Sequence, residues 1–127
     1  MRTAIGALCV RANRVLLLRK RDTWILPGGK PEAGEDDLSC LMRENSEELP
    51  RAIFIIGAFY AEFTGITPHS QTELRAKVYL AEVRGSLTPS AEISDAQFFS
   101  RNDFSDLEIS DITKKILDSA LETGHLF

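Results

Sequence analysis

The sequence predicts an α/β fold in which a mixed sheet lies between helices. Two observations lead to this expectation. Short apolar runs bounded by turn residues alternate with two stretches whose apolar residues recur at helical spacing. The chain has 127 residues, of which 43% are apolar and 27% charged, as in one ordinary globular domain spanning residues 1–127.

The first part of the chain predicts three extended segments. Thr3–Val10 and Arg14–Arg19 are short apolar runs, and the turn residues Ala12-Asn13 between them indicate a hairpin. Trp24–Leu26 is a third extended piece, which Pro27-Gly28-Gly29 ends. The N-terminal run is too short to span a membrane and lacks the cleavage pattern of a signal peptide. We therefore expect a cytoplasmic protein without membrane contact.

The middle of the chain predicts one helix followed by strands. The helix covers about Asp36–Leu49, with acidic residues at its start, where the helix dipole favours negative charge. Ile53–Thr64 and Thr72–Val83 read as two longer strands joined by the loop Gly65–Ser70. Gln97–Phe99 is a further short strand.

A second helix closes the chain. Ser110 is a good N-cap residue and Gly124 a good stop signal. Between them the apolar residues recur at helical spacing. These residues are Ile112, Ile116, Leu117, Ala120 and Leu121.

Charge and cysteine content exclude several classes of protein. The formal net charge is −4 and the pI about 5.2, so a binder of nucleic acid polymers, which would carry a basic surface, is not expected. A phosphate-bearing ligand must then be held by a metal ion or by a few placed Arg and Lys side chains. Cys9 and Cys40 form neither a disulfide framework nor a metal-ligand pair and are interpreted as reduced, small apolar residues.

The first helix carries the chemistry. Glu44, Glu47 and Glu48 are spaced by three and four residues, which places their carboxylates on one helical face. Hard divalent cations bind carboxylate oxygens, and Mg²⁺ takes one or two of them together with waters and substrate phosphates. A solvated acidic face is the alternative. The expected packing stripe lies roughly 120° around the axis. It consists of Leu38, Leu41, Met42 and Leu49.

The segment around these glutamates resembles the Nudix box. The motif of that family is Gly, five residues, Glu, seven residues, Arg-Glu, an apolar residue, any residue, Glu-Glu, any residue, Gly, apolar. A chance match at six positions is rarer than about 1 in 10⁵ at average residue usage, and the preceding Trp24–Gly28 also looks like the family's lead-in. The positions that match in register are Gly29, Glu35, Arg43, Glu44, Glu47 and Glu48.

Three positions depart from the motif. Asn45 replaces an apolar residue on the packing stripe, where we expect its amide to be hydrogen-bonded. Pro50 replaces the usual Gly and still ends the helix, because a proline pushes the preceding Leu49 out of the helical region. Arg51 replaces an apolar residue. No departure removes a carboxylate.

The resemblance implies an α/β/α sandwich and a role for each residue of the motif. Glu44, Glu47 and Glu48 would be the ligands of Mg²⁺, with Mn²⁺ as a possible substitute, and a backbone carbonyl of Gly28 or Gly29 would add an oxygen. Arg43 would pair with Glu35 or Glu47 and orient the carboxylates, and Glu35 would be structural. A further carboxylate often precedes the last helix in this family. Our candidate is Glu92, with Asp95 as second choice.

Substrate recognition is less specific in the sequence. The basic cluster Arg19-Lys20-Arg21 precedes the motif, and Arg19, Arg21, Lys30 and Arg75 are the candidates for phosphate contacts. Solvated surface cations are the alternative. The strand aromatics Phe59, Tyr60 and Phe63 are interpreted mainly as core residues, with stacking on a base as the alternative.

By this resemblance the protein is a pyrophosphohydrolase for a small nucleotide, acting as a monomer or homodimer. The compact size favours the mutator type, which converts a (deoxy)nucleoside triphosphate to monophosphate and pyrophosphate. An ADP-ribose or sugar-nucleotide pyrophosphatase is the alternative within the class. A non-catalytic nucleotide-binding regulatory module is the rival from another class, and an acidic Ca²⁺-binding protein lacks the twelve-residue loop pattern.

Overall fold

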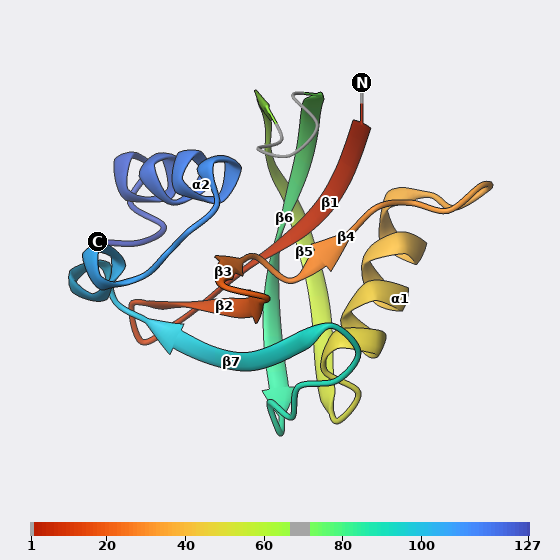
Figure 1. The fold of residues 1–127 in the computed structure, drawn as a ribbon, viewed down its shortest axis with the longest axis horizontal. Helices are drawn as coiled ribbons and strands as arrows, with labels where there is room; N and C mark the ends of the chain where they lie inside the picture. The colour runs from red at the N-terminus through yellow and green to blue at the C-terminus, as the bar shows by residue number, and fades with distance from the viewer. Residues whose placement is uncertain (1, 67–71) are drawn as a thin grey trace.

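The computed structural model describes residues 2–66 and 72–127 and has helices on both faces of a mixed sheet (Figure 1). The strands are β1 (Arg2–Arg11), β2 (Arg14–Lys20), β3 (Thr23–Ile25), β4 (Gly28–Gly29), β5 (Ala52–Ile66), β6 (Glu73–Gly85) and β7 (Ile93–Phe99). The helices are α1 (Asp37–Glu48), the 3₁₀ helix η1 (Arg101–Asp106) and α2 (Asp111–Glu122). The α/β prediction is confirmed.

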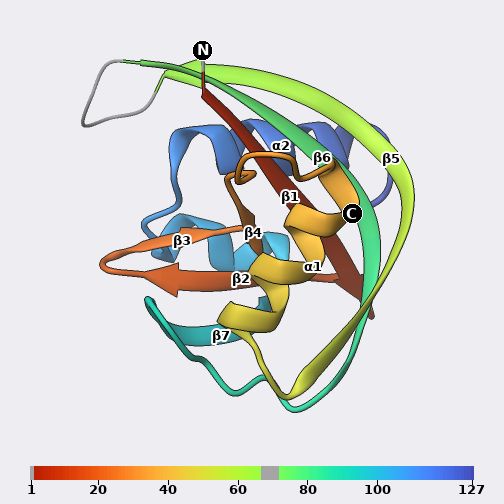
Figure 2. The same ribbon diagram turned by 90° about the vertical axis from the view of Figure 1, so that its right-hand side faces the viewer.

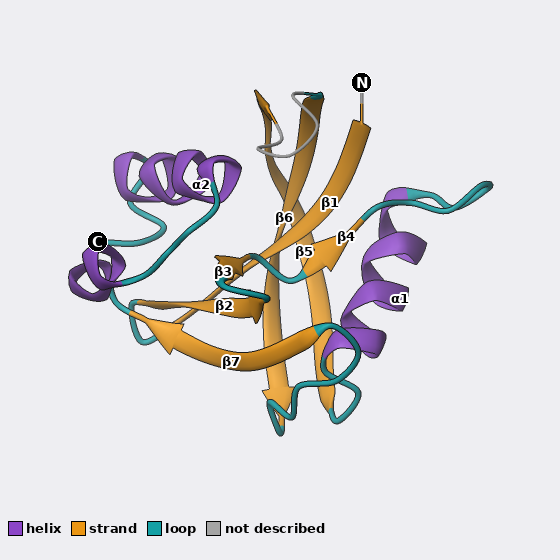
Figure 3. Cartoon of the chain, viewed as in Figure 1, coloured by secondary structure: helices purple, strands orange, loops and turns teal. Residues whose placement is uncertain are grey.

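Strand β1 is the central element of the sheet. The strand order is β3-β2-β1-β6-β5, with β4 paired to β1 and β7 paired to β2. β1 runs parallel to β6, from the pair Arg2 and Leu74 to the pair Cys9 and Ala81, whereas the other pairings are antiparallel. Figure 3 shows that the β2–β7 part of the sheet turns away from the long β5–β6 hairpin. The edge of β1 that faces away from β6 therefore has room for β4, which carries the glycines Gly28 and Gly29.

Each face of the sheet buries its own core cluster. Leu8, Trp24, Val78 and Leu117 belong to the cluster beneath α2, and Ile5, Leu16, Leu41 and Leu49 to the cluster beneath α1. Figure 2, turned by 90°, shows α1 in front of the sheet and α2 behind it. The alternation of side chains along β1 explains the division, because neighbouring residues of a strand point to opposite faces.

Local signals in the sequence set the element boundaries. Ala12 and Asn13 both have positive φ, 49° and 58°, as a tight two-residue hairpin turn requires. Asp36 caps α1 by accepting a hydrogen bond from the Ser39 amide at 2.8 Å. Leu49 leaves the helical region with φ −135° and ψ 75° just before Pro50, as expected.

Several sequence-based boundaries were too narrow. β5 and β6 are longer than the predicted strands Ile53–Thr64 and Thr72–Val83, and β7 begins at Ile93 rather than Gln97. Gly65 of the predicted loop belongs to β5, and positions 67–70 lie outside the described residues. β4 and η1 were missed because a two-residue strand and a short 3₁₀ helix have no periodicity to detect.

The predicted packing stripe of α1 is wrong at two of its four positions. Leu41 and Leu49 are fully buried, but Leu38 is 50% and Met42 57% exposed. Phe59 of β5, interpreted as core, is 52% exposed. It contacts Tyr79 edge to face at 5.3 Å.

Asn45 lies on the buried face of α1, as predicted, but its expected hydrogen bond is absent. The side chain is 2% exposed, and neither its oxygen nor its nitrogen has a partner among the described residues. The buried face instead includes Cys40 and Glu48. This helix therefore buries polar groups where apolar side chains were expected.

Candidate active site

Three glutamates of α1 lie in three different environments. Glu48 is only 7% exposed, and its Oε1 accepts a hydrogen bond from the Gly28 amide at 3.0 Å. The Glu44 side chain is 20% exposed, and the Glu47 side chain is 52% exposed. The alternative of a solvated acidic face does not hold for Glu48, which turns into the protein toward β4.

The two glycines of β4 allow the β1 backbone and the Glu44 side chain to lie close to this strand. Gly28 has φ +136°, and a Cβ there would lie 2.0 Å from the carbonyl oxygen of Ile5. A Cβ on Gly29 would lie 2.4 Å from Cδ of Glu44. Any side chain at position 29 would therefore displace the Glu44 carboxylate. This contact explains in physical terms why glycine occupies these positions.

Arg43 joins the carboxylates into one network. Its guanidinium makes two hydrogen bonds to Glu35, at 2.8 and 3.0 Å, and a third to the Lys30 carbonyl at 3.0 Å. The remaining nitrogen contacts Glu44 at 3.0 Å and Glu47 at 3.4 Å. Both partners implied for Arg43, Glu35 and Glu47, are present. The planar fork of arginine suits this two-point contact with a carboxylate.

The pKa values of the cluster diverge. Hydrogen bonds from the Arg43 side chain and from the Glu32 amide lower the pKa of Glu35 to about 2, so this carboxylate is ionised. Burial raises the pKa of Glu48 to about 8, against the opposing Gly28 hydrogen bond, and the nearby Glu44 charge raises it further. A buried carboxylate of this kind ionises readily only when a cation is brought close.

The donor set fits a hard divalent cation in kind, although the carboxylates do not converge. The three glutamates and the Gly29 carbonyl all offer oxygen, which Mg²⁺ and Mn²⁺ prefer. Within the described ranges no three acidic, His or Cys side chains form a ready-made cage. The contacts given above account for this, because Arg43 holds Glu44 and Glu47, and the Gly28 amide holds Glu48. Mg²⁺ needs only one or two carboxylates when waters and phosphates complete its shell.

A cavity of about 560 Å³ opens beside these glutamates, and we call it the acidic cavity. Glu92 lies at its rim, where its carboxylate pairs with Lys20 Nζ at 2.9 Å. Asp95, the second choice, instead accepts hydrogen bonds from the Ala96 amide and from Gln97 within β7. The charged residues lining the acidic cavity are Lys20, Lys30, Glu32, Arg43, Glu44, Glu47, Glu48 and Glu92.

Among the cations predicted to contact phosphate, only Lys30 lines the acidic cavity. Arg19 lies 3.8 Å from Asp22, and Arg75 lies 3.4 Å from Glu62 on the sheet face. Lys20, the central member of the basic cluster, reaches the cavity in place of Arg19 and Arg21. Simple strand alternation does not single out Lys20, because the pairing of β2 with β7 shifts register between Arg19 and Lys20.

A second cavity of about 190 Å³ adjoins the acidic cavity, with Gly28 and Gly29 in the lining of both, and we call it the apolar cavity. Apolar side chains of β1, β3, β6 and α2 line it, together with the hydroxyl residues Ser110 and Thr113. These two hydroxyls contact one another at 2.7 Å. No motif in the sequence pointed to this wall, because it is assembled from segments far apart in the chain.

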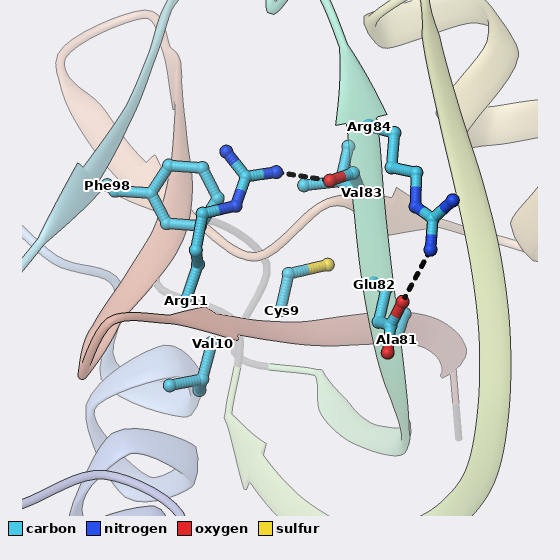
Figure 4. Close-up of a pocket in the computed structure, with 8 residues that line it drawn as sticks. All are labelled: Cys9, Val10, Arg11, Ala81, Glu82, Val83, Arg84 and Phe98. Atoms are coloured by element: carbon cyan, nitrogen blue, oxygen red, sulfur yellow. Dashed lines mark hydrogen bonds and ion pairs between the residues drawn. The ribbon is translucent and has the colours of Figure 1, made fainter.

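A third cavity, of about 260 Å³, lies where β1 parts from β6 (Figure 4). The Arg11 guanidinium stands over the Phe98 ring at 4.7 Å and donates a hydrogen bond to the Val83 carbonyl. Burial raises the pKa of the Cys9 thiol on its wall to about 12. None of its lining residues lines the acidic or the apolar cavity.

The sequence model of the NUDIX domain matches residues 1–119, so the chain belongs to the Nudix family. It is accordingly a hydrolase of phosphoanhydride bonds, and its general activity is that of a pyrophosphohydrolase. Nudix hydrolases act on small nucleotide substrates and generally use divalent metal ions. The carboxylates beside Gly28 and Gly29 are the chemical groups that suit this activity.

Solved structures of the family have the same fold. A MutT NUDIX hydrolase from Burkholderia pseudomallei is 25% identical, with a TM-score of 0.77 over 92% of this chain and 95% of that one. A putative nudix hydrolase family member from Chromobacterium violaceum is 27% identical, with a TM-score of 0.72 over 96% and 77%. A UDP-X diphosphatase is 24% identical, with a TM-score of 0.78 over 98% of this chain and 64% of that one.

No curated protein matches this chain in sequence. In the described part of the chain, no helix is long and apolar enough to cross a membrane.

Proposed function

We propose that this protein hydrolyses a (deoxy)nucleoside triphosphate to the monophosphate and pyrophosphate, with Mg²⁺ as cofactor and Mn²⁺ as a possible substitute. The observation that carries the proposal is that two cavities of different character adjoin one another. The acidic cavity, rich in carboxylate oxygen, and the apolar cavity share Gly28 and Gly29. A substrate that joins a metal-bound phosphate chain to an uncharged nucleoside would fill both.

In this proposal Glu44, Glu47 and Glu48 hold the metal, and the carbonyl of Gly28 or Gly29 adds an oxygen. When bound, the metal neutralises phosphate charge and lowers the pKa of a coordinated water. The protein orients these ligands through Arg43, which contacts Glu44 and Glu47, and through the Gly28 amide, which contacts Glu48. Orientation matters because reaction at phosphorus depends on the alignment of the attacking and leaving groups.

Cations at the acidic cavity would hold the phosphates. Lys30 and Lys20 both line it, and neither is buried. Glu92 lines the same cavity, and in this proposal its carboxylate takes a proton from water or adds a metal ligand. We assign Arg43 and Glu35 an orienting role, because their side chains are mainly occupied with each other.

Three organisational features remain predictions from the sequence. These are a single Nudix domain over residues 1–127, a location in the cytoplasm, and a monomeric or homodimeric state.

The decisive experiment is hydrolysis in ¹⁸O-labelled water with Mg²⁺ across a panel of dNTPs, oxidised dNTPs, ADP-ribose, UDP-sugars and dinucleoside polyphosphates. We expect pyrophosphate and a nucleoside monophosphate from the preferred triphosphate, with the label on whichever product carries the attacked phosphorus. Orthophosphate released directly from triphosphates would refute the proposal. A Glu47→Gln variant serves as the inactive control.

The same panel separates the alternatives. Turnover of ADP-ribose or a UDP-sugar with no triphosphate cleaved would establish a sugar-nucleotide pyrophosphatase. The similarity to a UDP-X diphosphatase is the reason to include these compounds. Tight Mg²⁺-dependent nucleotide binding without turnover of any compound would establish the non-catalytic regulatory module.

A further inference from the structure

Two backbone irregularities point at the same spot on the rim of the acidic cavity. The pairing of β2 with β7 shifts register between Arg19 and Lys20, since Arg19 pairs with Asp95 but Lys20 pairs with Ile93. A bulge of this kind re-aims the side chain beside it. On the facing loop, Ala91 adopts φ 56°, which is uncommon for a residue other than glycine.

An ion pair lies next to both irregularities. Lys20 Nζ lies 2.9 Å from Glu92 Oε2, and the two side chains are 45% and 74% exposed. The loop before β7 is also tied to the end of α1, because the Ser90 amide donates to the Glu48 carbonyl at 2.9 Å. The position of Glu92 is therefore set relative to the glutamates of α1.

Within this pair, the Glu92 carboxylate competes with the proposed substrate phosphate for the Lys20 ammonium group. Arg43 already contacts Glu32, Glu35, Glu44 and Glu47, so it has little capacity left for an incoming phosphate. Lys20, by contrast, forms an ion pair with one exposed carboxylate, that of Glu92, among the residues that the structure describes. Exposed ion pairs contribute little stability, so a phosphate chain with several charges can displace such a carboxylate at small cost.

We propose that the Lys20–Glu92 ion pair is an exchange contact, which breaks when substrate phosphate takes Lys20 and leaves the Glu92 carboxylate free at the rim of the acidic cavity. This inference rests on the proposed function, because it assumes a phosphate chain in that cavity. It makes Lys20 the phosphate ligand and Glu92 its internal competitor. It also ties the freeing of Glu92 to the arrival of substrate.

The test measures binding of inorganic pyrophosphate by calorimetry in excess EDTA, so that neither turnover nor metal ligation contributes. Lys20→Gln should weaken binding, and Glu92→Gln should strengthen it by releasing Lys20. Removing any negative charge from the cavity raises anion affinity, so Glu32→Gln is the matched control. Glu32 lines the same cavity and lies 3.5 Å from Arg43 instead of Lys20.

We expect Glu92→Gln to bind pyrophosphate about two- to five-fold more tightly than Glu32→Gln, the range that an exposed ion pair supports. In the Lys20→Gln background the extra gain should vanish, which a double-mutant cycle measures directly. Lys20→Arg, which keeps the charge, should retain binding. Circular dichroism of each variant checks that these exposed substitutions leave the fold intact.

Equal affinities for Glu92→Gln and Glu32→Gln would overturn the exchange, and so would a gain that persists without Lys20. Absence of pyrophosphate binding in all variants would overturn it as well. Failure of the proposed hydrolysis would appear separately, as missing turnover in the Mg²⁺-dependent panel, whereas these binding measurements contain no catalytic step.

Discussion

The two α-helices have the same length and similar N-caps, but they bury different kinds of residue. Each has 12 residues, an N-cap side chain that accepts from the third residue beyond it, and an acidic residue in its first turn. α2 buries Ile116, Leu117 and Ala120 and only one polar residue. α1 buries Asn45 and Glu48 and leaves Leu38 and Met42 half exposed.

The difference shows what a helix that carries the proposed metal ligands gives up. In α2 every buried group is apolar or hydrogen-bonded, since the Thr113 hydroxyl contacts Ser110. In α1 the buried face is turned so that Glu48 reaches the Gly28 amide beside the acidic cavity. Leu38 and Met42 of the same helix are half exposed. Burial that would stabilise a purely structural helix is exchanged for placement of a carboxylate.

The largest expected effect concerns the carboxylates of α1. Glu47→Gln should lower turnover by about 100-fold or more, equivalent to about 2.7 kcal/mol in the barrier. Loss of one negative charge relieves repulsion in the metal-free protein, so melting without metal should stay the same or rise. Mg²⁺ should then raise the melting temperature of the wild type more than that of the variant. Full activity in this variant, or in excess EDTA, would remove the glutamates from the site.

The pH dependence of stability should also follow α1. Burial raises the pKa of Glu48 to about 8 from an ordinary 4.5. Because the folded pKa is the higher one, ionisation favours the unfolded chain, and stability contributed below pH 4.5 is lost as pH rises toward 8. In metal-free protein, Glu48→Gln should therefore melt like wild type near pH 4 and several degrees higher above pH 8. Parallel melting curves at all pH values would mean that Glu48 ionises normally.

The comparison also explains which parts of the structure the sequence could predict. In α2 the predicted helical spacing of apolar residues agrees with burial, since Ile116, Leu117 and Ala120 are all buried. In α1 the same rule placed Leu38 and Met42 inside and Glu48 outside. The rule failed there because it assumes that hydrophobic burial alone orients a helix.

The residues of the motif and the residues that line the cavities also differ in how well the sequence predicts them. Arg43 and Glu35 could be matched because their spacing along one helix and its preceding loop is fixed. Lys20 and Ser110 could not be singled out, since their approach to the cavities depends on a β-bulge and on the packing of α2 against the sheet. Contacts between distant segments leave no periodic trace in a single sequence.

A smaller effect is expected at Asn45. Its buried amide has no hydrogen-bond partner among the described residues, and such a group costs about 1–3 kcal/mol. Asn45→Leu, which keeps the same branched side-chain skeleton, should stabilise the protein by about 1 kcal/mol or more in urea unfolding. Thr113→Val in α2 is the matched control and should destabilise, because it removes a satisfied buried hydroxyl. Loss of activity in Asn45→Leu at unchanged stability would instead assign Asn45 to the site.

The smallest expected effects come from the two N-cap residues. Here the variant in α2, and not the one in α1, is expected to change substrate binding. Ser110→Ala removes the cap of α2 and should cost about 1 kcal/mol of stability. Ser110 also lines the apolar cavity, so the KM for the nucleotide should rise in this variant if the nucleoside lies there.

Asp36→Ala removes the cap of α1, but the carboxylates lie more than a turn further along the helix. The melting temperature should therefore fall slightly, with kcat and KM nearly unchanged. Asp36→Asn should restore the melting temperature, because asparagine caps as well as aspartate does. A KM that responds to Asp36→Ala and not to Ser110→Ala would place the nucleoside outside the apolar cavity.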